Sequence, residues 1–71
     1  MQINYGKLRG KMKELGITQE LLAPKIGVSE GTLSAKLNSK TAFTTKEIAD
    51  ICRVLAISKM EIGEYFFAET V

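Results

Sequence analysis

Helix-capping signals recur along the chain and constrain its fold more than any other feature. At four places a Ser or Thr precedes a stretch with helical apolar spacing, and at two of them a glutamate follows three residues later. Such side chains accept hydrogen bonds from N–H groups that the first turn of a helix leaves unpaired, and the glutamates complete capping boxes. The caps are Thr18, Ser29, Thr44 and Ser58, and the glutamates are Glu47 and Glu61.

These signals divide the chain into about five short helices. Asn4 is the expected cap of the first helix, and Gly16 is expected to end it in a left-handed conformation. No run alternates apolar and polar residues with period two, except in the tail, so the predicted fold class is all-α. The predicted helices are about 5–14, 19–26 and 30–37, followed by one after Thr44 and one after Ser58.

The C-terminal tail, about 64–71, is aromatic and has high strand propensity. It is expected either to extend the last helix and pack on the core, or to form a strand or hook that pairs with a second chain. Tyr65, Phe66 and Phe67 are consecutive and cannot all point inward in one small domain. We therefore predict a dimer interface formed by these three aromatics.

Length and composition exclude several classes of protein. The 71 residues make a single domain with a small core, and they include one cysteine, Cys52, and no histidine. Disulfides, zinc sites and catalysis by Ser-His-Asp or Cys-His groups are therefore excluded. We expect no enzyme activity, no cofactor, no metal and no small-molecule substrate. The absence of a long apolar segment or a signal-peptide pattern predicts a cytoplasmic protein that does not bind membranes.

The charges are distributed unevenly along the chain. Residues 1–40 carry seven bases and three acids, a net charge of +4, whereas residues 41–71 carry three bases and five acids, a net charge of −2. A basic half joined to an acidic half indicates a face that meets an anion, and nucleic acid is the commonest such partner. Chance clustering on a solvated surface is the alternative.

The second and third predicted helices, about 18–37, have the residue pattern of a helix-turn-helix. Ala23 is small enough for two helices to cross closely, and Gly27 tolerates the positive φ that a tight turn requires. Val28 then fills the gap between the helices, and Leu33 anchors the third helix inward. An ordinary two-helix corner shows part of this pattern.

The segment from Ile17 to Ser34 resembles the Cro/repressor-type (Xre-like) helix-turn-helix family, in particular small single-domain prophage regulators. The likeness covers about residues 8–62, and the tail segment 61–67 is similar to tails in that group. The resemblance implies a lambda-repressor-like domain of five helices in residues 1–71. It also implies a repressor that binds double-stranded DNA as a homodimer, with the third helix in the major groove.

The resemblance assigns roles to individual positions. The residues that it places near base edges are Ser29, Glu30, Gly31, Ser34 and Ala35. The residues that it places near phosphates are Gln19, Thr32, Lys36, Asn38, Lys40 and Thr41.

The chain departs from the family pattern at several positions. Pro24 lies inside the second helix, where it removes a backbone hydrogen bond. Lys36 stands where the family usually buries an apolar residue. The third helix has no Arg, Gln or Asn for a bidentate base contact, although Glu30 is able to accept from a cytosine amine. The alternative function is therefore a protein-interaction module, antitoxin-like or anti-repressor, on the same scaffold.

Overall fold

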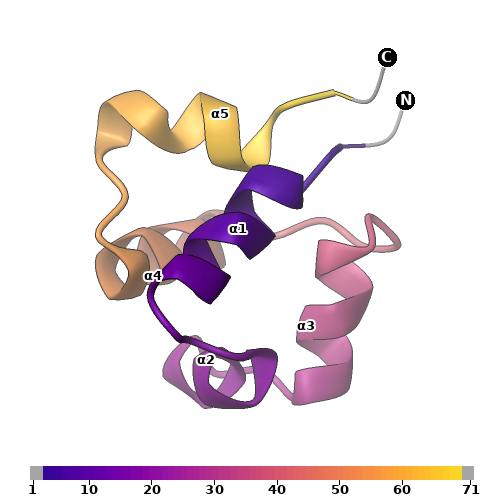
Figure 1. Cartoon of the computed structure of the whole chain (residues 1–71). Helices are drawn as coiled ribbons and strands as arrows, with labels where there is room; N and C mark the ends of the chain where they lie inside the picture. Colours follow the sequence, from indigo (N-terminus) through magenta and orange to yellow (C-terminus); the bar gives the residue numbers. More distant parts are fainter. Residues whose placement is uncertain (1–2, 70–71) are drawn as a thin grey trace.

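Five α-helices joined by short loops make up residues 3–69, the part of the chain that the computed structural model describes (Figure 1). Within these residues the only strand-like pairing is one antiparallel bridge between Ile3 and Glu69, and no helix is long and apolar enough to cross a membrane. The all-α prediction is confirmed. The helices are α1 (Gly6–Glu14), α2 (Gln19–Lys25), α3 (Glu30–Leu37), α4 (Thr45–Leu55) and α5 (Ile62–Phe66), and a 3-10 turn, η1 (Lys59–Glu61), precedes α5.

Three predicted caps hold the starts of α2, α3 and α4. The side chain of Thr18 accepts from the backbone N–H of Leu21 at 3.2 Å, and that of Ser29 accepts from Thr32 at 3.1 Å. At α4 the box is reciprocal: Thr44 accepts from the Glu47 N–H at 3.1 Å, and the Glu47 carboxylate accepts from the Thr44 N–H at 2.8 Å. Local hydrogen bonding therefore sets these three boundaries.

The ends of the chain differ slightly from the prediction. Asn4 lies one residue before the observed cap position, but its side-chain oxygen still accepts from the Gly6 N–H at 2.8 Å. The predicted box at Ser58 is present, with the Glu61 carboxylate accepting from the Ser58 N–H at 3.2 Å, yet it opens a 3-10 turn rather than an α-helix. Pro24 lies inside α2 but interrupts little of the helix, because α2 ends one residue later, at Lys25.

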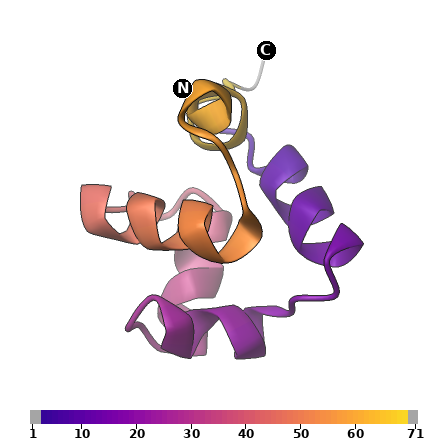
Figure 2. The same cartoon turned by 90° about the vertical axis from the view of Figure 1, so that its left-hand side faces the viewer.

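The core draws a buried side chain from each α-helix. α5 packs on α1 at one end of the molecule, and the α2–α3 pair lies at the other (Figures 1 and 2). The largest fully buried side chains are Leu8, Leu22, Leu33, Ile51, Leu55 and Phe66.

The aromatic tail packs mainly on its own chain. Tyr65 is 6% exposed and Phe66 is 2% exposed, whereas Phe67 remains 58% exposed. Tyr65 and Phe66 are therefore corrected as interface residues, because they are buried within one chain, whereas an interface through Phe67 stays a prediction. After α5, the Ala68 carbonyl accepts from the Asn4 N–H at 2.6 Å, which brings the two ends of the described segment together.

Three aromatic rings pack in a row between the N-terminal segment and α5. Phe43, in the loop before α4, packs edge-to-face against Tyr5, with ring centroids 5.3 Å apart, and against Phe66, with centroids 5.6 Å apart. Edge-to-face pairs of this kind contribute about 0.5–1.5 kcal/mol beyond their burial. The loop is thereby fixed between the N-terminal segment and α5.

Lys36 is buried beneath this loop and does not reach a phosphate, which corrects the prediction made for it. Its ammonium lies 2.8 Å from the Glu47 carboxylate, donates to the Ala42 carbonyl at 2.9 Å, and lies 5.9 Å from the Phe43 ring centre. The residue is only 8% exposed. The family's apolar side chain is thus replaced by a buried ion pair.

The ion pair acts on the acidity of Glu47. Burial of this carboxyl group raises its pKa, but the hydrogen bonds from Lys36 and Thr44 oppose that effect. The result is a pKa below the ordinary value for glutamate. Glu47 therefore stabilises the fold above the unfolded-state pKa of about 4.3, and this contribution is lost as the pH falls through the lower folded-state value.

We predict that Lys36→Met lowers the free energy of unfolding at pH 7 by about 3 kcal/mol, because it leaves a buried carboxylate without its cation. Urea denaturation at pH 7 and pH 3 measures the effect. The loss is expected to be smaller at pH 3, because in the variant burial without Lys36 raises the pKa of Glu47 and the carboxyl group binds a proton more readily. Lys46→Met is the control: Lys46 pairs with Asp50 at 3.1 Å, but its side chain is 83% exposed. This control is expected to cost less than about 1 kcal/mol. Equal losses in the two variants would contradict a structural role for the buried pair.

Candidate nucleic-acid interface

The α2–α3 unit has the geometry that its sequence predicts. Ala23 is 1% exposed at the crossing of the two helices, and Gly27 has a φ of +76° in the turn. The Val28 N–H donates to the Ala23 carbonyl at 3.1 Å, which ties the turn to the end of α2. Leu33 is fully buried and anchors α3, so the opposite face of α3 is directed outward.

The first turn of α3 is uncovered by the rest of the chain. Ser29, Glu30 and Gly31 are exposed, and Ser34 and Ala35 on the next turn are half-buried. A Cβ atom built on Gly31 meets no atom within 4 Å. The five residues predicted to face bases therefore lie together on one accessible face.

Ser29 and Thr32 are linked in a way that separates their roles. The Ser29 hydroxyl donates to the Thr32 hydroxyl oxygen at 2.9 Å while it accepts from the Thr32 N–H. The Ser29 hydroxyl is thus already hydrogen-bonded as donor and acceptor within the helix cap. The Thr32 hydroxyl is exposed and keeps its own hydrogen for an outside acceptor, such as a phosphate oxygen.

The other predicted phosphate contacts lie on both sides of α3. Gln19 is half-buried at the start of α2, and Asn38, Lys40 and Thr41 are exposed in the loop after α3. The Lys40 N–H donates to the Ala35 carbonyl at 2.9 Å, which holds the start of this loop against the helix end. The structure thus brings these residues to the edges of the α3 face, and only Lys36 is missing from the predicted set.

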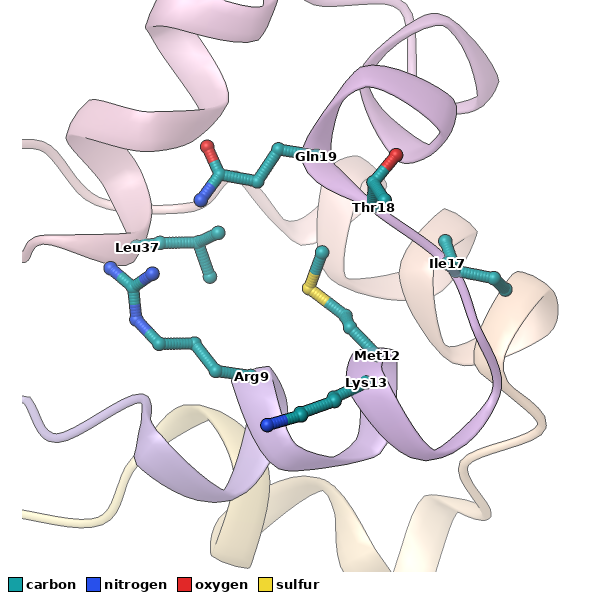
Figure 3. Close-up of a pocket in the computed structure, with 7 residues that line it drawn as sticks. All are labelled: Arg9, Met12, Lys13, Ile17, Thr18, Gln19 and Leu37. Carbon is teal, nitrogen blue, oxygen red and sulfur yellow. The ribbon is translucent and has the colours of Figure 1, made fainter.

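Two basic residues of α1 join the same region and were missed by the sequence analysis. Arg9 donates from its guanidinium to the side-chain oxygen of Asn38 at 2.8 Å, across the end of α3. Lys13 lies one turn later on α1 and, with Arg9 and Gln19, lines the same pocket (Figure 3). The four-residue spacing of Arg9 and Lys13 on one helix face was the available signal, and the turn at Gly16, with φ +69°, brings that face to the start of α2.

The ion pairs leave positive charge around α3. Within residues 3–69, the paired bases are Lys7 with Glu64, Lys36 with Glu47, and Lys46 and Arg53 with Asp50. The hydrogen bonds from Lys46 and Arg53 keep the pKa of Asp50 below its ordinary value. The bases without an acidic partner within 4 Å in the described chain include Arg9, Lys13, Lys25 and Lys40. Glu30 is the exposed acid on the α3 face itself.

The described residues contain no cluster suited to a metal: no three His, Cys, Asp or Glu side chains come together. Cys52 is half-buried on α4, and burial raises the pKa of its thiol. A raised pKa leaves the thiol protonated and unreactive at neutral pH. The chemistry available at the α3 face is therefore hydrogen bonding and charge.

A family model described as "Protein of unknown function (DUF739)" matches residues 1–69. No curated protein matches the chain. The match covers every helix described above, including α5.

We predict that Gly27→Ala destabilises the protein by about 1–2 kcal/mol, because φ of +76° is unfavourable for a residue with a Cβ atom. Gly31→Ala is the matched control. It is expected to be neutral or to stabilise the fold by up to about 1 kcal/mol, since its Cβ has open space on a helix. Thermal and urea unfolding of both variants measure the difference. A turn at Gly27 that tolerates alanine without cost would argue against the tight helix-turn-helix geometry.

Proposed function

We propose that this chain, which belongs to the family described as protein of unknown function (DUF739), is a DNA-binding transcriptional regulator. In this proposal α3 enters the major groove of an operator, and a dimer occupies two half-sites. Occupancy would block access of RNA polymerase, as expected for a repressor of prophage type. The protein itself carries out no chemical reaction and acts in the cytoplasm.

The observation that carries the proposal is the outward face of α3. Its first turn is uncovered by the chain, while its inner face is held by Leu33 and by the close crossing at Ala23. Around this face lie bases that have no acidic partner within the described chain, among them Arg9 and Lys40. A protruding helix with flanking free cations suits a groove between two rows of phosphates.

Base readout in this proposal rests on few groups. The Glu30 carboxylate accepts from a cytosine amine, and the Ser34 hydroxyl is compatible with several bases. Gly31 and Ala35 permit close approach of α3 to the groove floor. Because α3 offers no bidentate donor, much of the sequence preference is expected to come from the shape and deformability of the DNA.

Phosphate contacts would position the helix in the groove. The proposed contacts are four neutral donors and the Lys40 ammonium. They come from the start of α2, from α3 and from the loop after α3, so they would contact the phosphates on both sides of the groove. The groups are the Gln19 amide, the Thr32 hydroxyl, the Asn38 amide, the Lys40 ammonium and the Thr41 hydroxyl.

A second function remains open because α3 lacks bidentate donors. In the alternative, the same scaffold is a protein-interaction module of antitoxin-like or anti-repressor type. The observation that favours it is Leu21, a large apolar side chain on α2 that is 51% exposed. A partner protein would cover this side chain, whereas a DNA backbone would not.

Selection from a random duplex pool at low salt tests the proposal. An enriched inverted repeat is the expected outcome, together with a steep loss of affinity as salt is raised. Uniform recovery of sequences would contradict sequence-specific regulation. No recovery of any duplex would favour the protein-interaction module.

We predict that Lys40→Ala weakens binding to every duplex by a similar factor and reduces the salt dependence by about one phosphate contact. Lys59→Ala is the control, because Lys59 is exposed in η1, at the end of the molecule opposite α3 (Figure 1). Glu30→Ala is expected instead to change the preferred sequence. Titration of labelled duplexes at several salt concentrations measures all three. Equal effects of Lys40→Ala and Lys59→Ala would place the DNA elsewhere.

We predict that Phe67→Ser produces monomers, because Phe67 is the aromatic of the tail that stays exposed and available to a second copy. Met60→Ser is the matched control, since Met60 is 95% exposed on η1 and its loss also removes apolar surface. Sedimentation velocity of the free protein measures the mass. A dimer that persists in Phe67→Ser would move the interface away from the tail.

A further inference from the structure

A pocket of about 270 Å³ opens where α1, the start of α2 and the end of α3 meet (Figure 3). In Figure 3, Gln19 reaches over the pocket from α2, the Arg9 guanidinium lies beside Leu37, and the Met12 side chain points into the space between them. The lining residues are Arg9, Met12, Lys13, Ile17, Thr18, Gln19 and Leu37.

The lining combines an apolar floor with a cationic rim. Met12 and Leu37 belong to the buried core, and Ile17 packs against it. Arg9 and Lys13 come from the same face of α1, and no carboxylate lines the pocket. A site with this lining favours a ligand that has both a negative group and an apolar part.

The polar side chains at the pocket have N–H groups that are free to donate to an anion. Arg9 donates one guanidinium N–H to Asn38 at 2.8 Å, which fixes its position and leaves its other N–H groups available. The Gln19 side chain forms no hydrogen bond with another residue in the range 3–69, so its amide N–H groups are free to donate. Lys13 has no acidic partner within 4 Å in the same range.

We infer that this pocket binds a small organic anion, a carboxylate or phosphate monoester that carries a short apolar chain or ring. The anionic group lies between Arg9, Lys13 and the Gln19 amide, and the apolar part covers Met12 and Leu37. A bare phosphate of the DNA backbone satisfies the rim but leaves the apolar floor uncovered.

Occupancy of the pocket lowers affinity for DNA, because the ligand engages Gln19 and Arg9 beside the loop that carries Lys40. This second part of the inference rests on the proposed function, whereas binding of the anion to the free protein does not. The pocket would therefore couple the concentration of a small anion to release of the operator.

Binding is tested on the full chain by NMR titration with hexanoate, observed at the Gln19 side-chain amide and the Met12 methyl group. Saturating shifts with a millimolar dissociation constant are expected, and acetate, hexylammonium and inorganic phosphate are expected to bind at least tenfold more weakly. Lys13→Gln is expected to weaken hexanoate binding about threefold to tenfold, as loss of one charge-assisted contact implies. Lys25→Gln, at the exposed end of α2, is the control and leaves the affinity unchanged.

Three results would overturn the inference about the ligand. They are the absence of shifts at Gln19 and Met12, equal binding of acetate or inorganic phosphate and hexanoate, and equal effects of Lys13→Gln and Lys25→Gln. If acetate or inorganic phosphate bound as tightly as hexanoate, the pocket would bind the anionic group alone, and Met12 and Leu37 would not contribute to affinity.

The coupling to DNA is tested separately by adding hexanoate to the chain bound to its selected duplex, with sodium chloride of equal ionic strength as the control. Release is expected near the hexanoate dissociation constant. A duplex that stays bound at hexanoate saturation would overturn the coupling alone. A chain that binds hexanoate but no duplex would overturn the proposed function and leave the anion site standing.

Discussion

The buried ion pair between Lys36 and Glu47 is the interaction on which the arrangement of the helices depends. It joins the inner side of α3 to the first turn of α4, and the same glutamate caps that turn through Thr44. Phe43 lies over the pair and connects it to Tyr5 and Phe66. Breaking a buried pair leaves an unpaired charge in the interior. Arrangements of α3 and α4 that separate Lys36 from Glu47 are therefore unfavourable. The orientation of α3 is set from its inner side, away from the face proposed for DNA.

The parts of the fold that the sequence predicted are those governed by neighbouring residues. Caps at Thr18, Ser29 and Thr44 depend on hydrogen bonds spanning three residues, and the turn at Gly27 depends on one φ angle, so each is legible locally. The misassigned residues depend on distant partners. Lys36 was read as a surface base because its partner Glu47 lies beyond the loop, and Phe66 was read as interfacial because Phe43 and α1, which cover it, are far away in the chain.

The candidate site shows the same division between local and distant effects. The accessible positions of α3 followed from the resemblance to the Cro/repressor-type family, which implies that they face outward while Leu33 faces the core. The contribution of α1 did not, because Arg9 meets Asn38 only after the chain folds back at Gly16. Three segments therefore build one surface: α1 supplies charge, α2 supplies the Gln19 amide, and α3 supplies shape. A change in the packing of α1 would alter that surface without touching a residue of the helix-turn-helix.

The bridge between Ile3 and Glu69 places the two described ends of the chain side by side, beside α5 (Figure 1). The Ser39 hydroxyl, just after α3, donates to the Ile3 carbonyl, so these ends lie near the C-terminal end of α3 and away from its first turn. Chains whose ends lie close together at the surface accept circular permutation and end-to-end fusion. A short flexible linker is therefore sufficient to close the chain into a ring, with new ends placed in an exposed loop. Two copies joined head to tail would likewise leave the first turn of each α3 uncovered, so the number of such faces in one polypeptide becomes a matter of design.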